Sequence, residues 1–383
     1  MIRKVKIQNF KSHKNTILDL KNLTVLCGNN GVGKSSAIQL FLLLREAYIK
    51  DKSFDILDLK SNPVKIGTPN DAIYQFSQND SFQIDLSTTD EELSFLYEAK
   101  SAEEKVKTFI SLNKEKSKTS ITIFSESLFN TNFQYIGASR FGPQEKYEKD
   151  DKIVGVHKQI SVLEGKAEYF VHFLDKYKDE EVIQEICKLD EISKYTDLAA
   201  QVIAWEKSIS AGINIEIEDI GKLGFLLKYN FETEASPTKK TKNFEATNVG
   251  FGLSYVMPIL VAILSAQKGA LIIIENPEAH LHPNGIAKLT ELICLAAQAG
   301  IQIILETHSD HIINGILVQS KKFEQGEKGI DRHNISIYHF DRDENEHCTK
   351  PTKIEIEEEG LIRYPPKGFF DQFSIDRRFL LDF

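Results

Sequence analysis

The sequence lacks paired cysteines, long apolar runs and an excess of positive charge, and each absence excludes a class of protein. Its four cysteines, Cys27, Cys187, Cys294 and Cys348, stand alone. This predicts neither a disulfide framework nor a zinc site and suits a reducing cytoplasm. No run approaches the roughly 20 apolar residues of a membrane span, and the N-terminal stretch lacks the apolar core of a signal peptide. We therefore expect a cytoplasmic protein with no membrane partner.

The formal net charge of -9 argues against a wholesale electrostatic grip on nucleic acid, because nonspecific DNA affinity comes mainly from phosphate neutralisation. A local basic run remains near the start of the chain, at Arg3, Lys4, Lys6, Lys11 and Lys14. It could touch DNA, but a solvated strand face is the preferred interpretation. Helical periodicity between residues 158 and 210 contains no sustained heptads, which excludes a long coiled-coil arm there.

What the sequence does contain is a nucleotide-binding pattern between a short apolar run at 23–27 and a helical pattern that starts near residue 36. Glycines allow the backbone N–H groups of such a loop to surround a phosphate, and the helix N-terminus adds a favourable dipole. Lys34 would reach the outer phosphates, and the Ser35 hydroxyl would ligate magnesium. The alternative is a glycine-rich turn that only joins a strand to a helix. The loop is Gly28-Asn29-Asn30-Gly31-Val32-Gly33-Lys34-Ser35, and its candidate nucleotide-binding residues are Asn29, Asn30, Gly31, Gly33, Lys34, Ser35 and Ser36.

Between this loop and residue 245 the pattern is mostly β, with helical stretches. Strands are predicted at 2–9, 16–20, 120–124, 213–218 and 223–231. The strongly charged residues 91–118 are predicted to form a solvated helix or a mobile insertion. Arg140 follows a strand end and is either a surface ion-pair residue or a group aimed at a nucleotide or partner.

A second cluster begins with the glycines of residues 247–254 and leads into an apolar helix through Leu264. The continuous apolar run 270–275 ends in Glu275, as a strand buried on both faces would. A turn and a helix at 283–299 follow, and then a third buried strand at 301–305. Repetition of strand, polar end and helix predicts a parallel, doubly wound core whose ligands bind at the strand ends.

These motifs, in this order, resemble the ATP-binding-cassette (ABC)-like ATPases of the SMC, RecF and OLD group, above all the compact bacterial OLD-like ATPases without long coiled coils. The resemblance implies an α/β, ABC-ATPase head-like P-loop NTPase fold with a mixed or parallel central sheet, an antiparallel β subdomain and a helical insertion. A single domain over 1–383 would combine lobe 1–150 with lobe 245–383, and residues 151–244 would form the insertion. The motifs that carry the resemblance are 2–35, 135–143, 250–254, 275–283, 306–309 and 364–372.

The resemblance also implies roles for matched residues, with ATP and Mg²⁺ as cofactors. Ser35 and Glu275 would hold the metal, Glu275 at the Walker B position. His308 would sense the γ-phosphate; its alternative is a helix cap or a polar-pocket residue. ATP would lie between two copies of the chain, so a homodimer or higher homo-oligomer is expected. The signature residues that would cap the partner's nucleotide are Gly250, Gly252 and Ser254.

One departure concerns hydrolysis. Many relatives carry a glutamate directly after the Walker B acid, and this chain has Asn276. An amide can orient water but cannot take its proton, so slow, partner-dependent hydrolysis is expected. Glu278 could serve as the water-facing carboxylate or pair across the dimer. His280 and His282 invite a metal interpretation, but the resemblance places them in the loop that contacts the opposing subunit.

The preferred function is an ATP-driven switch that regulates a DNA-linked effector such as a nuclease, in bacterial anti-phage defence as the resemblance implies. Direct DNA binding is possible on this view. The alternative is a scaffold that holds ATP without turnover and assembles or restrains the partner. An intrinsic nuclease is disfavoured, because the acidic run at 341–344 sits in a predicted hairpin with too little chain around it for a further domain.

Overall fold

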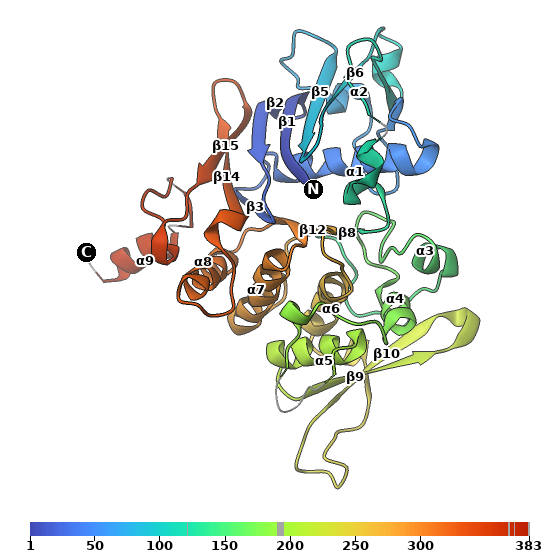
Figure 1. Cartoon of the computed structure of the whole chain (residues 1–383), viewed down its shortest axis with the longest axis vertical. Coiled ribbons are helices and arrows are strands. Elements are labelled where there is room, and N and C mark those ends of the chain that lie inside the picture. Colours follow the sequence, from blue (N-terminus) through green and yellow to red (C-terminus); the bar gives the residue numbers. More distant parts are fainter. Residues whose placement is uncertain (121, 190–194, 367, 371, 382–383) are drawn as a thin grey trace. The chain divides into compact units, whose positions relative to one another are not determined.

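The computed structural model describes residues 1–120, 122–189, 195–366, 368–370 and 372–381 (Figure 1). The chain forms two compact units, one of residues 1–123 with 305–383 and the other of residues 124–304. The boundary between the units falls inside strand β13 (Gln302–Glu306). The predicted lobes and insertion follow a different division and stay a prediction.

An antiparallel sheet in the first unit is built from strands that alternate apolar and polar residues. Its order is β2-β1-β5-β6-β7-β4. On β1 the side chains of Val5 and Ile7 are buried, whereas those of Arg3 and Lys4 are exposed, as a solvated basic face requires. The predicted antiparallel β subdomain is therefore present. The strands are β1 (Ile2–Phe10), β2 (His13–Asp19), β4 (Ile56–Asp58), β5 (Ser81–Thr88), β6 (Glu92–Glu98) and β7 (Phe109–Leu112).

Two of these strands, β6 and β7, show that the prediction for residues 91–118 was wrong. This stretch contributes to the sheet and is neither a solvated helix nor a separate insertion. Leu93, Phe95 and Tyr97 are buried at every second position of β6. The charged residues between and around them concealed this period-two pattern, which is the signal of a half-buried strand.

The phosphate loop lies between a buried strand and a helix, as predicted. Strand β3 (Leu23–Gly28) leads into it and helix α1 (Lys34–Asp51) follows. Strand β14 (Ile335–Asp343) runs parallel to β3, and β15 (Cys348–Ile354) is antiparallel to β14. Next to β3 on its other side, Thr307 after the end of β13 donates its N–H to Leu26 O at 3.1 Å. Helix α8 (Asp310–Glu324) continues from there.

The second unit contains the strand that ends in Glu275 and the apolar helix that follows Gly250. Strands β8 (Phe133–Ile136) and β12 (Leu271–Glu275) pair in parallel, in agreement with the predicted core. Most of α6 is buried, which explains why its sequence is apolar on all sides. Helix α5 packs against both α6 and α7. The helices are α4 (Phe170–Tyr177), α5 (Leu198–Ile209), α6 (Phe251–Leu264) and α7 (Pro283–Gln298), and the small antiparallel sheet has the order β11 (Phe244–Glu245), β10 (Phe225–Phe231), β9 (Ile213–Asp219).

The remaining helices are short: α2 (Pro69–Ala72), α3 (Asp151–Gly155) and α9 (Gln372–Leu380). The strand predicted at 120–124 is not formed in its described part, because Thr122–Ser125 is a 3-10 turn; residue 121 lies outside the described residues. The motif at 364–372 lies partly outside them, at 367 and 371. Within the described parts of the chain, no helix combines the length and the apolar character needed to cross a bilayer.

Candidate functional site

The phosphate loop in the first unit presents an uncapped helix N-terminus. Gly33 is the N-cap of α1 with a left-handed φ of 104°, and its lack of a side chain leaves the first turn without a side-chain cap. That turn also carries no acidic residue. The first turn therefore supplies no carboxylate of its own to cap its N–H groups, and a helix N-terminus of this kind can bind an anion. Asn29, Asn30 and Gly31 lie exposed along the loop.

Lys34 is held against the inside of the same loop. Its side chain is buried, and Nζ donates to Gly28 O at 3.0 Å and to Asn29 O at 2.6 Å. Burial lowers the pKa of Lys34, and the nearby Glu306 carboxylate opposes this shift. An ammonium group whose hydrogen bonds go to neutral carbonyls can exchange these carbonyls for phosphate oxygens, which form stronger, charge-assisted hydrogen bonds.

The Ser35 hydroxyl has a carboxylate partner that the sequence interpretation missed. Ser35 Oγ donates to Glu306 Oε1 at 3.0 Å, and Glu306 is buried at the end of β13. A hydroxyl beside a carboxylate offers two of the oxygen ligands that Mg²⁺ prefers. Glu306 ends a buried strand just as Glu275 does, and this same signal could have identified it. Ser36 follows, half-buried, on the first turn of α1.

His308 lies two residues beyond Glu306, and its side chain is exposed. The segment that carries it is tied to β3 by the hydrogen bond from Thr307 N to Leu26 O. The Thr307 hydroxyl also accepts the N–H of Ser309 at 3.0 Å, which shapes the turn into α8. The first unit therefore brings together Lys34, Ser35, Glu306 and the His308 segment.

In the second unit, Glu275 is fixed at the end of β12. Tyr135 donates its hydroxyl to Oε1 at 3.0 Å, and the Ala138 N–H donates to Oε2 at 3.3 Å. Burial raises the pKa of Glu275, while these two donors and the Arg140 charge act in the opposite direction. The carboxylate is thus oriented by β8 and by the turn that follows it.

Arg140 is a buried clamp on the turn after Glu275. Its side chain is 3% exposed, and it donates to the backbone carbonyls of Gly137, Tyr255, Glu275 and Asn276 at 2.9 to 3.1 Å. The guanidinium also lies 3.9 Å from the centre of the Tyr255 ring. Burial lowers the pKa of Arg140 to about 10. The surface ion-pair alternative is therefore wrong, and these donors are used inside the unit.

Asn276 occupies a strained position directly beyond the Walker B acid. Its φ of 45° is left-handed, a region in which asparagine is enriched among residues with a side chain. Its Oδ1 is buried, and no donor among the described residues reaches it. The amide is in place, yet it has no basic site for a water proton. Glu278 is half-buried two residues later.

The three predicted signature residues occupy different environments. Ser254 is fully buried, and its hydroxyl lies 3.1 Å from the hydroxyl of Tyr229. At Gly252 a Cβ would lie 2.4 Å from His280 O, so glycine is required by packing within the unit. Gly250, the N-cap of α6, is exposed, has a φ of -57° and would have nothing within 4 Å of a Cβ. Its own chain therefore does not demand glycine there.

The two histidines of the following turn have structural contacts. The His280 ring packs on Phe251 and Tyr255, with ring centres 4.5 and 5.0 Å apart. His282 Nδ1 accepts the N–H of Asn284 at 3.4 Å and caps α7. Within the residues that the structure describes, no three His, Cys, Asp or Glu side chains gather as a metal cluster.

The acidic run at 341–344 ends β14 and begins the turn to β15, where the Asp343 carboxylate accepts the N–H groups of Asn345 and Glu346. The run therefore lies in a hairpin, as the sequence predicts.

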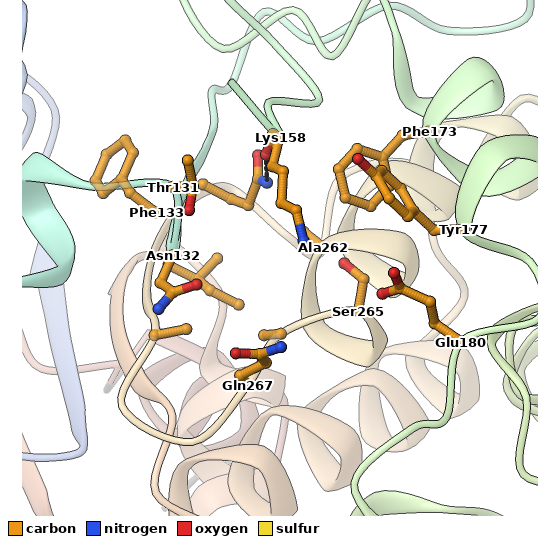
Figure 2. A pocket seen from close by; sticks show the side chains of 14 residues that line it. Thr131, Asn132, Phe133, Lys158, Phe173, Tyr177, Glu180, Ala262, Ser265 and Gln267 are labelled. Atoms are coloured by element: carbon orange, nitrogen blue, oxygen red, sulfur yellow. Dashed lines mark hydrogen bonds between the residues drawn. The ribbon is translucent and has the colours of Figure 1, made fainter. Parts of the chain in front are cut away.

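The second unit contains a hollow (Figure 2) whose lining does not include Glu275. Lys158, Tyr177 and Glu180 surround it, and Ser265 at the end of α6 and Ile272 near the start of β12 also line it. Glu275 stands at the opposite, carboxyl end of β12. Because ligands of open α/β sheets bind at the carboxyl ends of the strands, this hollow is not part of the candidate site.

Family models match three parts of the chain. An "AAA ATPase domain" model matches residues 1–188, which contain the phosphate loop. An "AAA domain" model, whose description names the AbiEii toxin and a type IV toxin–antitoxin system, matches residues 209–314, which contain the signature, Walker B and His308 motifs. A model described as a protein of unknown function (DUF3696) matches residues 330–380. No curated protein matches the chain significantly.

Solved structures with the same fold are SMC head domains. An Smc head bound to the C-terminal winged-helix domain of ScpA is 13% identical with a TM-score of 0.53, over 93% of this chain and 98% of that one. A Pyrococcus furiosus Smc head with an extended coiled coil, bound to the C-terminal domain of ScpA, is 13% identical with a TM-score of 0.51, over 100% and 98%. The predicted head-like P-loop fold is confirmed. Two ATPase-domain models thus match separate parts of a chain whose fold is that of the SMC heads.

Proposed function

We propose that this protein is a slow, ATP-driven switch that dimerises around Mg²⁺-ATP and regulates an effector protein. The observation that carries the proposal is the first-unit cluster, in which an uncapped α1 N-terminus, the buried Lys34 ammonium and the Ser35–Glu306 pair meet at one loop. Each of these groups matches a part of a magnesium nucleotide: the N–H groups and ammonium match phosphate oxygens, and the hydroxyl and carboxylate match the metal.

The metal would be held by Ser35, with Glu306 as the carboxylate at that hydroxyl. The resemblance assigns Glu275 to the metal as well, directly or through water. A bound Mg²⁺ would neutralise charge that develops on the phosphates during transfer. His308, exposed just after Glu306, is the group we assign to sensing the γ-phosphate.

Closure around ATP is supported by Gly250. An exposed glycine at a helix N-cap, with an ordinary φ and open space around it, is not explained by the fold of its own unit. Close approach of a second molecule's phosphate would explain it, because the N-terminus of α6 is a favourable site for an anion. Gly252 and the buried Ser254 would support that terminus through His280 and Tyr229.

Slow hydrolysis is supported by Asn276, whose amide can orient water but cannot act as a base. Glu278, two residues further along the chain, would take over part of that role. The same residue favours the alternative, a scaffold that keeps ATP bound without turnover and assembles or restrains a partner nuclease. Turnover measured with and without the partner separates the two functions.

The partner we propose is an effector such as a nuclease, in bacterial anti-phage defence and in the cytoplasm, with DNA as a further ligand. The support is indirect: the solved heads of this fold are bound to domains of another protein, ScpA, and one matching model names a toxin–antitoxin system.

The proposal is tested by equilibrium ATP binding and by the mass of the protein in solution. We expect the wild type to bind ATP with Mg²⁺ and to double its mass in light scattering with a non-hydrolysed ATP analogue. Lys34→Ala should weaken binding at least about 100-fold through loss of charge-assisted phosphate contacts. Lys50→Ala, at the exposed far end of the same helix, is the matched control. If Lys34→Ala bound ATP as tightly as the wild type, the assignment of the ATP site would be wrong. If the mass in solution did not change with the ATP analogue, dimerisation around ATP would be wrong.

A further inference from the structure

Three successive carbonyls of the phosphate loop each accept a hydrogen bond from a side chain outside the loop. Thr349 Oγ1 donates to Val32 O at 2.8 Å, and His13 Nε2 bonds Gly33 O at 2.9 Å. The Arg342 guanidinium donates through Nη2 to Gly31 O. The donors come from two hairpins that are far apart in sequence, β1–β2 and β14–β15. None of the three donors was assigned a role from the sequence.

The protonation of these donors follows from the chemistry of a carbonyl, which only accepts. His13 Nε2 must therefore carry a proton, and Nδ1 accepts from the Thr16 hydroxyl at 2.9 Å. Burial lowers the pKa of His13 to about 4, so the ring is neutral at neutral pH. Thr349 Oγ1 gives its only proton to Val32, so it accepts from Ser12 Oγ at 2.7 Å.

These bonds determine which way the loop amides face. In a trans peptide the C=O of one residue and the N–H of the next point in opposite directions. The carbonyls of Gly31, Val32 and Gly33 point toward the two hairpins that donate to them. The N–H groups that follow them in the chain, those of Val32, Gly33 and Lys34, therefore point away from these hairpins. Successive amides turned the same way form an anion-binding concavity, and the outer hydrogen bonds keep it in that shape before any phosphate arrives.

The β14–β15 hairpin lies beside the β1–β2 hairpin (Figure 1). Thr349 N donates to Ser12 O at 2.7 Å, and Lys14 pairs with Glu346 at 2.6 Å. A Cβ at Gly33 would lie 2.3 Å from Thr349 Oγ1 and 2.6 Å from Ser12 Oγ. Glycine is required there by the approach of the hairpins as well as by its positive φ.

We infer that the β14–β15 hairpin, which begins the segment matched by the family of unknown function, is a working part of the nucleotide site. Arg342 and Thr349 are positioning residues that hold the loop open for the phosphates from outside. Because coupling between two events is reciprocal, nucleotide binding stabilises the hairpin in turn. This inference rests on the proposed function, since it assigns the device that prepares the same loop.

The first test compares ATP affinity in variants of β15. Thr349→Val keeps the volume, removes the donor to Val32 and leaves that buried carbonyl unpaired, so we expect the dissociation constant for ATP to rise about 10-fold. Thr349→Ser keeps the hydroxyl and should restore affinity to within about twofold. Thr352→Val, an exposed threonine on the same strand, is the matched control and should bind as the wild type does. Thermal unfolding without nucleotide checks that each variant folds.

The second test measures hydrogen exchange of the amides at 342–349 with and without a non-hydrolysed ATP analogue and Mg²⁺. We expect slower exchange on binding in the wild type and no change in Lys34→Ala, a result that a purely structural hairpin would not give. Wild-type affinity in Thr349→Val, or unchanged exchange in a wild type that binds the analogue, would overturn this inference alone. A wild type that binds no nucleotide would overturn the proposed function and the inference with it.

Discussion

The phosphate loop of the first unit and the Glu275–Asn276 turn of the second unit are both held by hydrogen bonds to backbone carbonyls, but with different results. At the loop, side-chain donors such as His13 and Thr349 hold the carbonyls on the outer side. The loop N–H groups, Lys34 and Ser35 are then on the side where a ligand would bind. At the turn, Arg140 fixes the backbone, and the residue after the acid is an amide. On the proposed function, the first region is prepared for binding, whereas the second is held by Arg140 and has no base directly after Glu275.

The comparison separates two properties that are often inferred together from one motif. A complete phosphate loop predicts that a chain binds a nucleotide, and it says nothing about the rate at which the bond to the γ-phosphate breaks. Phosphoryl transfer depends on positioning and charge neutralisation, so a rigid turn without a base permits slow turnover. Variants that disturb one region at a time test whether binding and hydrolysis are separate in this protein.

The largest effect is expected from Arg140→Met, which keeps much of the side-chain volume and removes every hydrogen bond of the clamp. Several carbonyls would lose their donor, so we expect a loss of about 3 to 5 kcal/mol in the free energy of unfolding. Chemical denaturation measures it. Lys146→Met, an exposed residue in the same unit, is the control. A loss below about 1 kcal/mol, the size of an ordinary exposed contact, would show that the turn is not held by Arg140.

The stability of the folded protein should depend on pH through His13. Its pKa is about 4 in the folded protein against an ordinary 6.5, so the unfolded chain binds more protons between these values. Stability should therefore be fully present above pH 6.5 and fall as the pH drops toward 4, by about 3 kcal/mol over the whole window. Denaturation of the wild type and His13→Gln from pH 7.5 to 4.5 measures it. An equal fall in both proteins would contradict the assignment to His13.

The smallest effect is expected at Asn276. Asn276→Glu introduces a base at the turn, and general-base catalysis predicts a turnover about 10-fold higher or more, with ATP affinity little changed. Asn276→Gln is the matched control, because glutamine has the size of the introduced glutamate and the same backbone strain at this position but no basic group. Equal rates in the two variants would show that the missing base does not limit hydrolysis.

Several parts of this molecule could be predicted from the sequence because their signals are local. The strand, loop and helix around Lys34 lie within about 30 consecutive residues, and the end of β12 is marked by the change from isoleucine to Glu275. The sheet strand at Leu93, Phe95 and Tyr97 was missed although its signal is also local, because charged neighbours outweighed the alternation.

Other parts depend on contacts that leave no trace in a local pattern. Ser35 meets Glu306 across 271 positions of sequence, and Thr349 meets Val32 across 317. Ser254 points inward because of the way α6 packs on β10, where the Tyr229 hydroxyl meets the Ser254 hydroxyl. Only the folded chain defines these pairs, and they decide which groups face a nucleotide.

The central claim is that nucleotide binding is prepared while hydrolysis is weak, and one experiment on the purified chain tests both. ATP binding with Mg²⁺ is measured by calorimetry, and hydrolysis is followed under single-turnover conditions in the same preparation. We predict saturable binding that Lys34→Ala abolishes, with a rate constant far below the roughly 10 per second of a typical enzyme. Absence of binding, or hydrolysis by the wild type as fast as by Asn276→Glu, would contradict the account.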